Sequence, residues 1–188
     1  MAVRTGDGVL KTNLVLIGMP GVGKSTLGVI LAKVLGYEFV DTDLVIQKSQ
    51  EKLLKEIIAE LGPEGFIALE NRIISGLELT GSVVATGGSV VYGREAMQAL
   101  SENGIIIYLK QELEELSRRL HNIRNRGVVL KEGQTLEDLY GERCSLYEQY
   151  ADIIVDESGK DVEGTLEALR GQLKQYAAAG SGRCAEDA

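Results

Sequence analysis

The sequence predicts an α/β fold of three layers, in which a five-stranded parallel sheet carries helices on both faces. Short apolar runs alternate along the chain with longer amphipathic stretches, as in proteins whose strands are joined by helices. The expected strands are residues 14–17, 39–40, 82–85, 105–109 and 153–155. Each glycine-rich or acidic segment follows one of these strands, and open parallel sheets bind ligands at the carboxyl ends of their strands. The sequence therefore predicts a ligand site along that edge of the sheet.

The segments between the strands have the spacing of helices. Residues 25–35 end at Gly36, a residue that commonly terminates helices. Residues 44–79 are expected to be mostly helical, with a break at residues 62–65, where glycine and proline gather. Further helices are expected at residues 94–101, 112–120, 135–150 and 162–176. Thr135 is the expected N-cap of the helix that it begins, and the basic, weakly periodic residues 122–134 are expected to form a loop.

Length, charge and cysteine usage exclude several classes of protein. The 188 residues suit one domain, expected over residues 1–176, with residues 177–188 as a flexible tail. A formal charge of −8 argues against general binding to nucleic acids or anionic membranes, which needs a basic surface. No apolar run approaches the ~20 residues that span a bilayer. With two cysteines and no apolar run typical of a signal peptide, we expect a cytoplasmic protein, and a monomer.

The segment from Gly18 to Ser25 matches the phosphate-binding pattern G-x-x-x-x-G-K-[ST] in full. An expected strand precedes it and an expected helix follows, which is the context that the pattern requires. Its glycines let backbone amides converge on phosphate oxygens, and the helix adds unpaired amides and the positive end of its dipole. The flanking elements argue against an accidental match. The predicted nucleotide-binding residues are Gly21, Val22, Gly23, Lys24, Ser25 and Thr26, and the predicted ligands are ATP and Mg²⁺.

Asp41 and Asp43 stand two residues apart where the second strand ends. Residues i and i+2 of a strand point the same way. One carboxylate would hold Mg²⁺ through water, and the other would orient an acceptor hydroxyl and take its proton. The alternative is two solvated acids, one of which caps the helix that begins near Leu44. Their place beside a phosphate loop in a parallel sheet favours the functional interpretation.

Arginines gather before and within the expected loop, at positions 118, 119, 124 and 126, and Arg143 follows on the next helix. Arginine stabilises the charge that develops on a phosphoryl group in transfer. A basic loop that closes on the phosphates would also exclude water. The alternative is a solvated basic face, which the pattern favours slightly except for Arg126 and Arg143.

Taken together, these motifs resemble the shikimate kinase family of P-loop enzymes over about residues 14–176. The resemblance rests on the phosphate loop, residues 40–43, Gly87-Gly88, Arg119 and Arg126 in the lid region, and residues 143–147. It implies a three-layer P-loop fold with a mobile lid at about residues 120–134. It also implies transfer of phosphate from ATP to a hydroxyl of a small carboxylated acceptor, with shikimate the best guess.

The resemblance also implies a role for each matching residue. On the nucleotide side, Lys24 and Ser25 hold phosphate and Mg²⁺, Asp41 supports Mg²⁺ through water, Arg119 lies against the adenine, and Arg126 is the lid arginine on the transferring phosphate.

On the acceptor side, Asp43 binds the hydroxyls of the acceptor and acts as the base. Gly87 and Gly88 let their backbone approach the acceptor, and Arg143 grips its carboxylate. The implied catalytic residues are Lys24, Asp43 and Arg126.

Three departures from the family pattern concern the acceptor and the lid. The family usually carries Phe-Arg-x-x-Glu in the helical segment after the second strand, and that arginine helps to bind shikimate. Here Glu70 matches, but Ile67 stands in place of the arginine. Ser89 replaces a usual third glycine, and Val128-Val129 replaces a usual proline-leucine pair.

These departures leave kinase chemistry intact and keep other acceptors open, such as gluconate or homoserine. A nucleotide switch or a partner-regulated ATPase is the alternative from another class, because phosphate loops occur there too. Against it, no conspicuous apolar segment suggests a surface for a protein partner.

Overall fold

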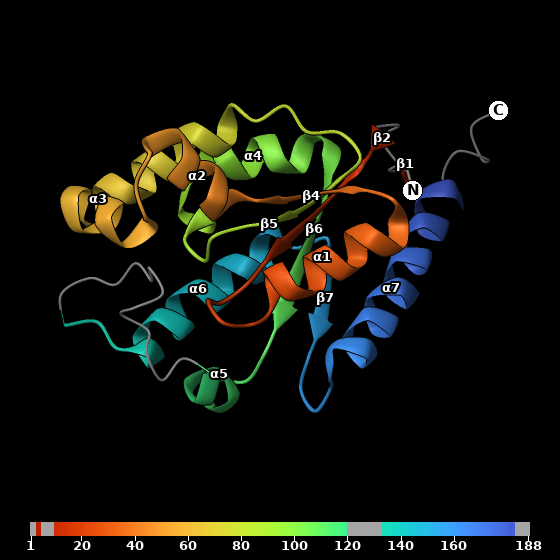
Figure 1. Cartoon of the computed structure of the whole chain (residues 1–188). Helices are drawn as coiled ribbons and strands as arrows, with labels where there is room; N and C mark the ends of the chain where they lie inside the picture. Colours follow the sequence, from red (N-terminus) through yellow and green to blue (C-terminus); the bar gives the residue numbers. More distant parts are fainter. Residues whose placement is uncertain (1–2, 5–9, 120–132, 183–188) are drawn as a thin grey trace.

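The computed structural model describes residues 3–4, 10–119 and 133–182, and its main sheet has five parallel strands (Figure 1). The strands are β3 (Asn13–Ile17), β4 (Glu38–Asp41), β5 (Ser82–Ala85), β6 (Gly104–Lys110) and β7 (Ile153–Asp156). They lie in the order β4-β5-β3-β6-β7, and every neighbouring pair is parallel. The predicted five-stranded parallel sheet is therefore confirmed.

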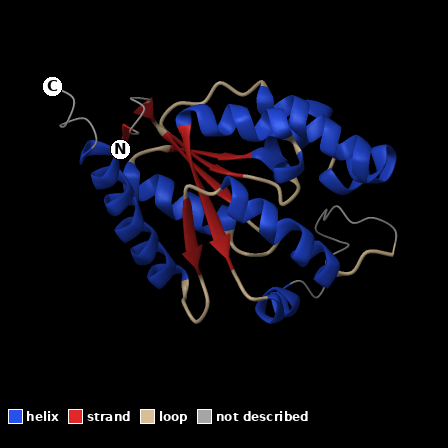
Figure 2. Ribbon diagram, turned by 180° about the vertical axis from the view of Figure 1, so that it is seen from behind, coloured by secondary structure: helices blue, strands red, loops and turns tan. Residues whose placement is uncertain are grey.

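Helices cover both faces of this sheet. Within the described ranges they are α1 (Lys24–Leu35), α2 (Thr42–Gln50), α3 (Leu54–Ser75), α4 (Arg94–Asn103), α5 (Leu113–Arg119), α6 (Leu136–Tyr150) and α7 (Val162–Gly182), with a 3-10 turn η1 (Val90–Tyr92). The helices α1 and α7 pack on one face, and α4 and α6 pack on the other, which Figure 2 shows from behind. The predicted three-layer α/β architecture is confirmed. None of the described helices is both long enough and apolar enough to cross a membrane.

The central strands are almost entirely apolar because helices bury both faces of the sheet. Strands β3 and β5 are buried along their whole length, and β6 is buried as far as Leu109. A smaller second core, made of Ile46, Ile57, Phe66 and Leu69, lies between α2 and α3. These two helices thus have their own apolar support beside the carboxyl end of β4.

The stretch predicted as mostly helical, residues 44–79, divides differently from the expectation. The predicted break at residues 62–65 narrows to Gly62, whose φ of 68° and ψ of 176° interrupt α3. Pro63 then begins a new helical turn, where its missing N–H has no helical partner to lose. An unpredicted break follows α2 at Glu51, which has a φ of 53°. Because non-glycine residues rarely adopt this conformation, the sequence pattern gives no sign of it.

Both ends of the chain differ from the sequence-based expectation. The helix predicted to end at Tyr176 continues to Gly182, so the predicted tail of residues 177–188 begins in α7. Residues 177–179 are alanines, the best helix formers, and Ala177 packs against the main core. Residues 183–188 lie outside the described ranges. An unpredicted hairpin of β1 (Val3–Arg4) and β2 (Leu10–Lys11) precedes the sheet.

Most of the loop predicted at residues 122–134 lies outside the described ranges, as does the lid predicted at about residues 120–134, apart from residues 133–134. The helix that follows is confirmed. Thr135 caps α6 by accepting a hydrogen bond from the backbone of Asp138.

The side chain of Asn13 forms hydrogen bonds that link the start of β3 to Leu79, Ser82 and Asn103. Its side-chain amide donates to the carbonyl of Leu79 at 2.8 Å and to Oδ1 of Asn103 at 2.9 Å. Its oxygen accepts from the backbone N–H of Ser82 at 3.0 Å. Replacement of Asn13 by Leu keeps the volume similar but leaves the N–H of Ser82 buried without this partner. We expect Asn13→Leu to lower the free energy of unfolding by about 2–4 kcal/mol, measured by chemical denaturation.

Gln175→Leu is the matched control, because Gln175 is exposed on α7. Its free energy of unfolding should stay within about 0.5 kcal/mol of wild type. A similarly small change in Asn13→Leu would show that this hydrogen-bond network does not stabilise the fold.

Candidate active site

A cavity of about 460 Å³ opens at the carboxyl ends of β3, β4 and β5. Its walls come from the phosphate loop, the start of α2, α3, the turn after β5, and α6. The lining residues are Pro20, Gly21, Gly23, Lys24, Ser25, Thr26, Asp43, Leu54, Phe66, Thr86, Gly87, Gly88, Ser89 and Arg143. Residues of the predicted phosphate loop, the acid Asp43, the glycines after β5 and Arg143 are far apart in the sequence, yet they line the same cavity.

The phosphate loop joins β3 to α1 in the predicted strand–loop–helix context. Gly18, Gly21 and Gly23 have φ values of 143°, 78° and 117°, which side chains rarely tolerate. No side chain caps α1, which begins at Lys24 after Gly23. The first amides of α1 and the positive end of its dipole therefore face the loop, as anion binding requires.

Lys24 lies inside this loop and is buried. Its ammonium donates to the carbonyl oxygens of Gly18 at 2.7 Å and Met19 at 3.0 Å. Burial lowers the pKa of Lys24 to about 8, and the nearby Asp43 opposes that change. A phosphate group that entered the cavity would meet a positively charged group already fixed by the backbone.

Ser25 and Asp41, the two predicted Mg²⁺ ligands, are in contact. The Ser25 hydroxyl donates to Oδ2 of Asp41 at 2.8 Å. The other oxygen of Asp41, Oδ1, accepts from the backbone N–H groups of Asp43 at 3.0 Å and Leu44 at 3.4 Å, and so caps α2. The capping alternative and the metal interpretation are thus compatible, because each uses a different oxygen. A hydroxyl and a carboxylate are also the hard oxygen donors that Mg²⁺ prefers.

Asp43 is oriented by a helix rather than by a strand. Strand β4 ends at Asp41 and α2 begins at Thr42, so the two acids do not lie on one strand and the i, i+2 spacing of a strand does not orient them. Asp43 lines the cavity, and its buried Oδ1 has no hydrogen-bond partner in the described part of the chain. Burial, helped by Asp41, raises the pKa of Asp43 to about 6. A carboxylate with a raised pKa is suited to accept a proton from a hydroxyl.

The turn after β5 brings backbone against the cavity. A side chain at Gly87 would place its Cβ 2.5 Å from Oε1 of Glu70 and 2.8 Å from Oδ1 of Asp43. A Cβ at Gly88 would lie 2.9 Å from Pro20. A larger residue at either position would displace Glu70, Asp43 or Pro20, and with glycine there a bound molecule meets backbone.

Arg143 on α6 supplies a buried positive charge to the same cavity. Only 1% of its surface is exposed. Its Nε donates to the hydroxyl of Tyr92 at 3.3 Å, and the guanidinium lies 5.2 Å from the centre of the Tyr92 ring. The cavity therefore has a cationic group near its glycine turn as well as in its phosphate loop.

Arg119 lies on the other side of the phosphate loop, beside a separate cavity of about 320 Å³. Its Nη1 donates to the carbonyl of Val22 at 3.2 Å and lies 3.9 Å from Oε2 of Glu157. Burial raises the pKa of Glu157 to about 7, and Arg119 opposes this. No sequence pattern singles out Glu157, which follows β7.

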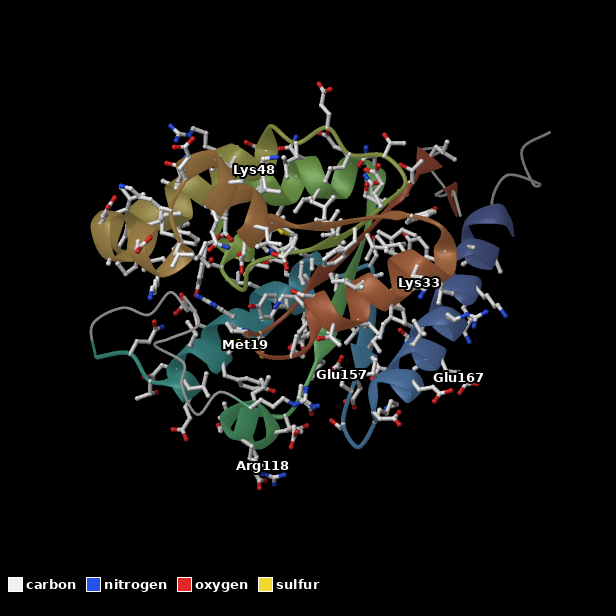
Figure 3. All side chains as sticks on the ribbon, in the orientation of Figure 1. Met19, Lys33, Lys48, Arg118, Glu157 and Glu167 are labelled. Atoms are coloured by element: carbon white, nitrogen blue, oxygen red, sulfur yellow. The ribbon has the colours of Figure 1, made fainter. Side chains whose placement is uncertain are left out.

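Of the other arginines in this group, Arg118 lies within the described ranges, where it lines the cavity beside Arg119 but not the main cavity. Arg118 is exposed, pairs with Glu114 and Glu115 on its own helix, and points outward in Figure 3. It fits the solvated basic face that was the alternative interpretation. Arg124 and the predicted catalytic Arg126 lie outside the described ranges.

The departures at Ile67 and Ser89 have distinct surroundings. Ile67 does not line the main cavity. It packs against the second core and lines a neighbouring space of about 170 Å³. The Ser89 hydroxyl donates to Oε2 of the buried Glu70 at 2.6 Å. The sequence pattern assigns no role to Glu70. Its position among apolar residues of a helix is the feature that could have indicated a buried acid.

Comparisons with known proteins agree over most of the chain. The family model described as shikimate kinase matches residues 20–174. A shikimate kinase of Persephonella marina is 35% identical, over 86% of this chain and 99% of that protein. One of Vibrio vulnificus is 39% identical, over 81% of this chain and 92% of that protein.

Solved structures show the same similarity. A shikimate kinase from Acinetobacter baumannii in complex with shikimate has a TM-score of 0.80 and 27% identity, and the match covers 88% of this chain and 94% of that one. A gluconokinase from Sinorhizobium meliloti, at 17% identity and a TM-score of 0.52, shares the fold over 89% of this chain and 94% of that one.

Proposed function

The chain belongs to the shikimate kinase family, and from that premise we propose that it transfers the γ-phosphoryl group of ATP to a hydroxyl of shikimate, giving shikimate 3-phosphate. One observation carries the proposal. Lys24 of the phosphate loop, Asp43 of α2 and Arg143 of α6 line a single cavity. These are a phosphate ligand, a proton acceptor and a carboxylate ligand, which this reaction requires together.

On the nucleotide side, Lys24 and the amides of the loop and of α1 would hold the phosphates. Ser25 and Asp41 would hold Mg²⁺, which would neutralise phosphate charge during transfer. The contact of Arg119 with Val22 supports a place for the adenine beside Arg119.

On the acceptor side, Asp43 would accept a hydrogen bond from the reacting hydroxyl and align its oxygen with the γ-phosphorus. As the new P–O bond forms and the bond to ADP breaks, the hydroxyl proton passes to Asp43. Gly87 and Gly88 would contact the acceptor through backbone, and Arg143 would bind its carboxylate. We assign Arg126 to the charge on the transferring phosphoryl group.

The substitution at Ile67 affects the expected affinity rather than the chemistry. Ile67 can donate no hydrogen bond, and loss of one such bond to a charged group costs about 1.5–3 kcal/mol. We therefore expect shikimate to bind roughly ten- to a hundredfold more weakly than with an arginine at this position. If Ile67→Arg does not improve the affinity for shikimate, the missing arginine is not what limits binding.

We also propose that the protein acts as a monomer in the cytoplasm. All the assigned residues come from one chain, and two cysteines form no disulfide framework of the kind found in secreted domains.

The experiment that tests the function measures ADP release in a coupled assay with shikimate, gluconate, homoserine and nucleosides. Shikimate should give the highest kcat/KM. Turnover of another hydroxyl compound with none of shikimate at millimolar concentration would refute the acceptor but not the kinase activity. ADP release that no acceptor accelerates would favour a nucleotide switch or ATPase.

Asp43→Asn keeps the size of the side chain but removes the proton acceptor. We expect kcat to fall about 10²- to 10⁴-fold, while the KM for ATP changes little because Asp43 contacts the acceptor. Steady-state kinetics checks both values. Glu60→Gln, an exposed change on α3, is the control and should keep wild-type kcat. A wild-type kcat in Asp43→Asn would remove Asp43 from the reaction.

The two contacts of Asp41 can be separated by substitution. Asp41→Ala should lower the free energy of unfolding by about 1 kcal/mol because α2 loses its cap, whereas Asp41→Ser should restore most of it. Both variants should require more Mg²⁺ for half-maximal turnover. Chemical denaturation and magnesium titrations measure the two effects. Full magnesium affinity in Asp41→Ser would show that Asp41 only caps the helix.

A further inference from the structure

Glu70 is a buried acid that the proposed reaction does not use. It lies on α3 with 1% of its surface exposed. Its Oε2 accepts the hydroxyl of Ser89 at 2.6 Å, and its Oε1 is buried with no hydrogen-bond partner among the described residues. Ser89 is buried as well. This bond therefore joins α3 to the turn after β5 in the interior of the protein.

Glu70 touches the turn but does not line the main cavity. Gly87, Gly88 and Ser89 line it, whereas Glu70 lies behind them. A Cβ added to Gly87 would be 2.5 Å from Oε1 of Glu70, so this carboxyl group rests against the backbone that faces the cavity. Any effect of Glu70 on a bound acceptor must pass through this turn or through its charge.

Groups on three helices and the turn influence the charge of Glu70. Burial raises its pKa to about 7, the Ser89 hydrogen bond lowers the pKa, and Asp43 of α2 raises it. Arg143 of α6 and Lys24 of α1 lower it. Ile67, on the same helix, brings no compensating charge. Near neutral pH Glu70 thus changes between an uncharged acid and a carboxylate.

We propose that Glu70 and Ser89 form a positioning pair that holds the Gly87–Gly88 turn against the acceptor, and that acceptor affinity depends on Glu70 being uncharged. This rests on the proposed function, because it concerns the same cavity. A charged Glu70 would offset the positive charge of Arg143, which the acceptor carboxylate needs. It would also place a second negative charge near Asp43. An uncharged Glu70 keeps the hydrogen bond from Ser89 without either penalty.

The protonation of Glu70 can be measured without any acceptor. Difference infrared spectra between wild type and Glu70→Gln should reveal a protonated carboxyl band that disappears as the pH rises through about 7. In Ser89→Ala the band should persist to higher pH, because the lost hydrogen bond favours the charged form. Absence of the band at acidic pH, or an unchanged midpoint in Ser89→Ala, would overturn the coupling between the two residues.

Kinetics tests the effect on the acceptor. In wild type the KM for the acceptor should rise about three- to tenfold as the pH passes through 7, whereas in Glu70→Gln it should lack this rise, since one weakened polar contact has about this effect. The other titrating groups are common to both proteins, so the difference between the two profiles isolates Glu70. The value of kcat and the KM for ATP should stay within about twofold of wild type, because the pair does not touch the nucleotide.

Two further variants separate positioning from general damage. Glu70→Ala and Ser89→Ala should raise the KM for the acceptor about fivefold even at acidic pH, and Glu70→Gln should not, because its amide oxygen can still accept from Ser89. Glu60→Gln, on the exposed part of α3, should leave every parameter unchanged. Equal losses of kcat and of ATP affinity in Glu70→Ala would indicate a purely structural role and overturn the proposal.

The experiments distinguish a failure of this proposal from a failure of the proposed function. If wild type does not phosphorylate shikimate, the function is refuted, and the kinetic comparison uses the acceptor that the ADP-release assay identifies. If no acceptor is found, hydrogen exchange of the peptide covering residues 86–92 decides. Faster exchange in Glu70→Ala but not in Glu70→Gln supports the pair, and equal exchange overturns it.

Discussion

The parallel pairing of β4 with β5 and of β5 with β3 is the constraint on which the site depends. It brings the carboxyl ends of three strands to one edge of the sheet, and each strand there ends in a different chemical segment. The phosphate loop follows β3, Asp41 ends β4, and Gly87 follows β5. Because β3 and β5 are buried along their whole length, their register is fixed by packing, and β4 pairs with β5 at the edge of the sheet. The three segments are therefore held at one edge of the sheet, and Met19 and Val22 of the phosphate loop also pack in the main core.

Burial shifts the pKa values of the ionisable groups at this edge of the sheet. Lys24, Asp43 and Glu70 are removed from water, which lowers the pKa of the lysine and raises the pKa of both acids. Such pKa shifts, gathered in one part of the protein, are typical of functional sites. Burying these groups costs stability, which a protein tolerates where function requires it. The fold offsets that cost with apolar packing in its two cores. The second core supports α3, which carries Glu70 against the glycine turn.

The two sides of the cavity differ in how closely they follow the family pattern. On the phosphate side, the residue types match the family pattern, Lys24 donates to the carbonyl of Gly18, and Ser25 contacts Asp41. On the proposed acceptor side, Ile67 packs against the second core and lines a neighbouring space, and Ser89 bonds to Glu70. The departures therefore alter the support of the acceptor pocket while Asp43, Gly87 and Arg143 remain around it.

The sequence by itself determined the layers, the five strands and the phosphate loop, because these depend on local periodicity and on residue types at fixed spacing. It also indicated that Asp43, Gly87 and Arg143 belong to one site, through their positions after strands and on the next helix. Only the tertiary structure decided how they meet. The turn from β4 into α2 places Asp43 on a helix that lines the cavity, the left-handed Glu51 separates α2 from α3, and the Glu70–Ser89 bond joins residues 19 positions apart. Such contacts arise from packing between elements, and no local pattern of residues encodes them.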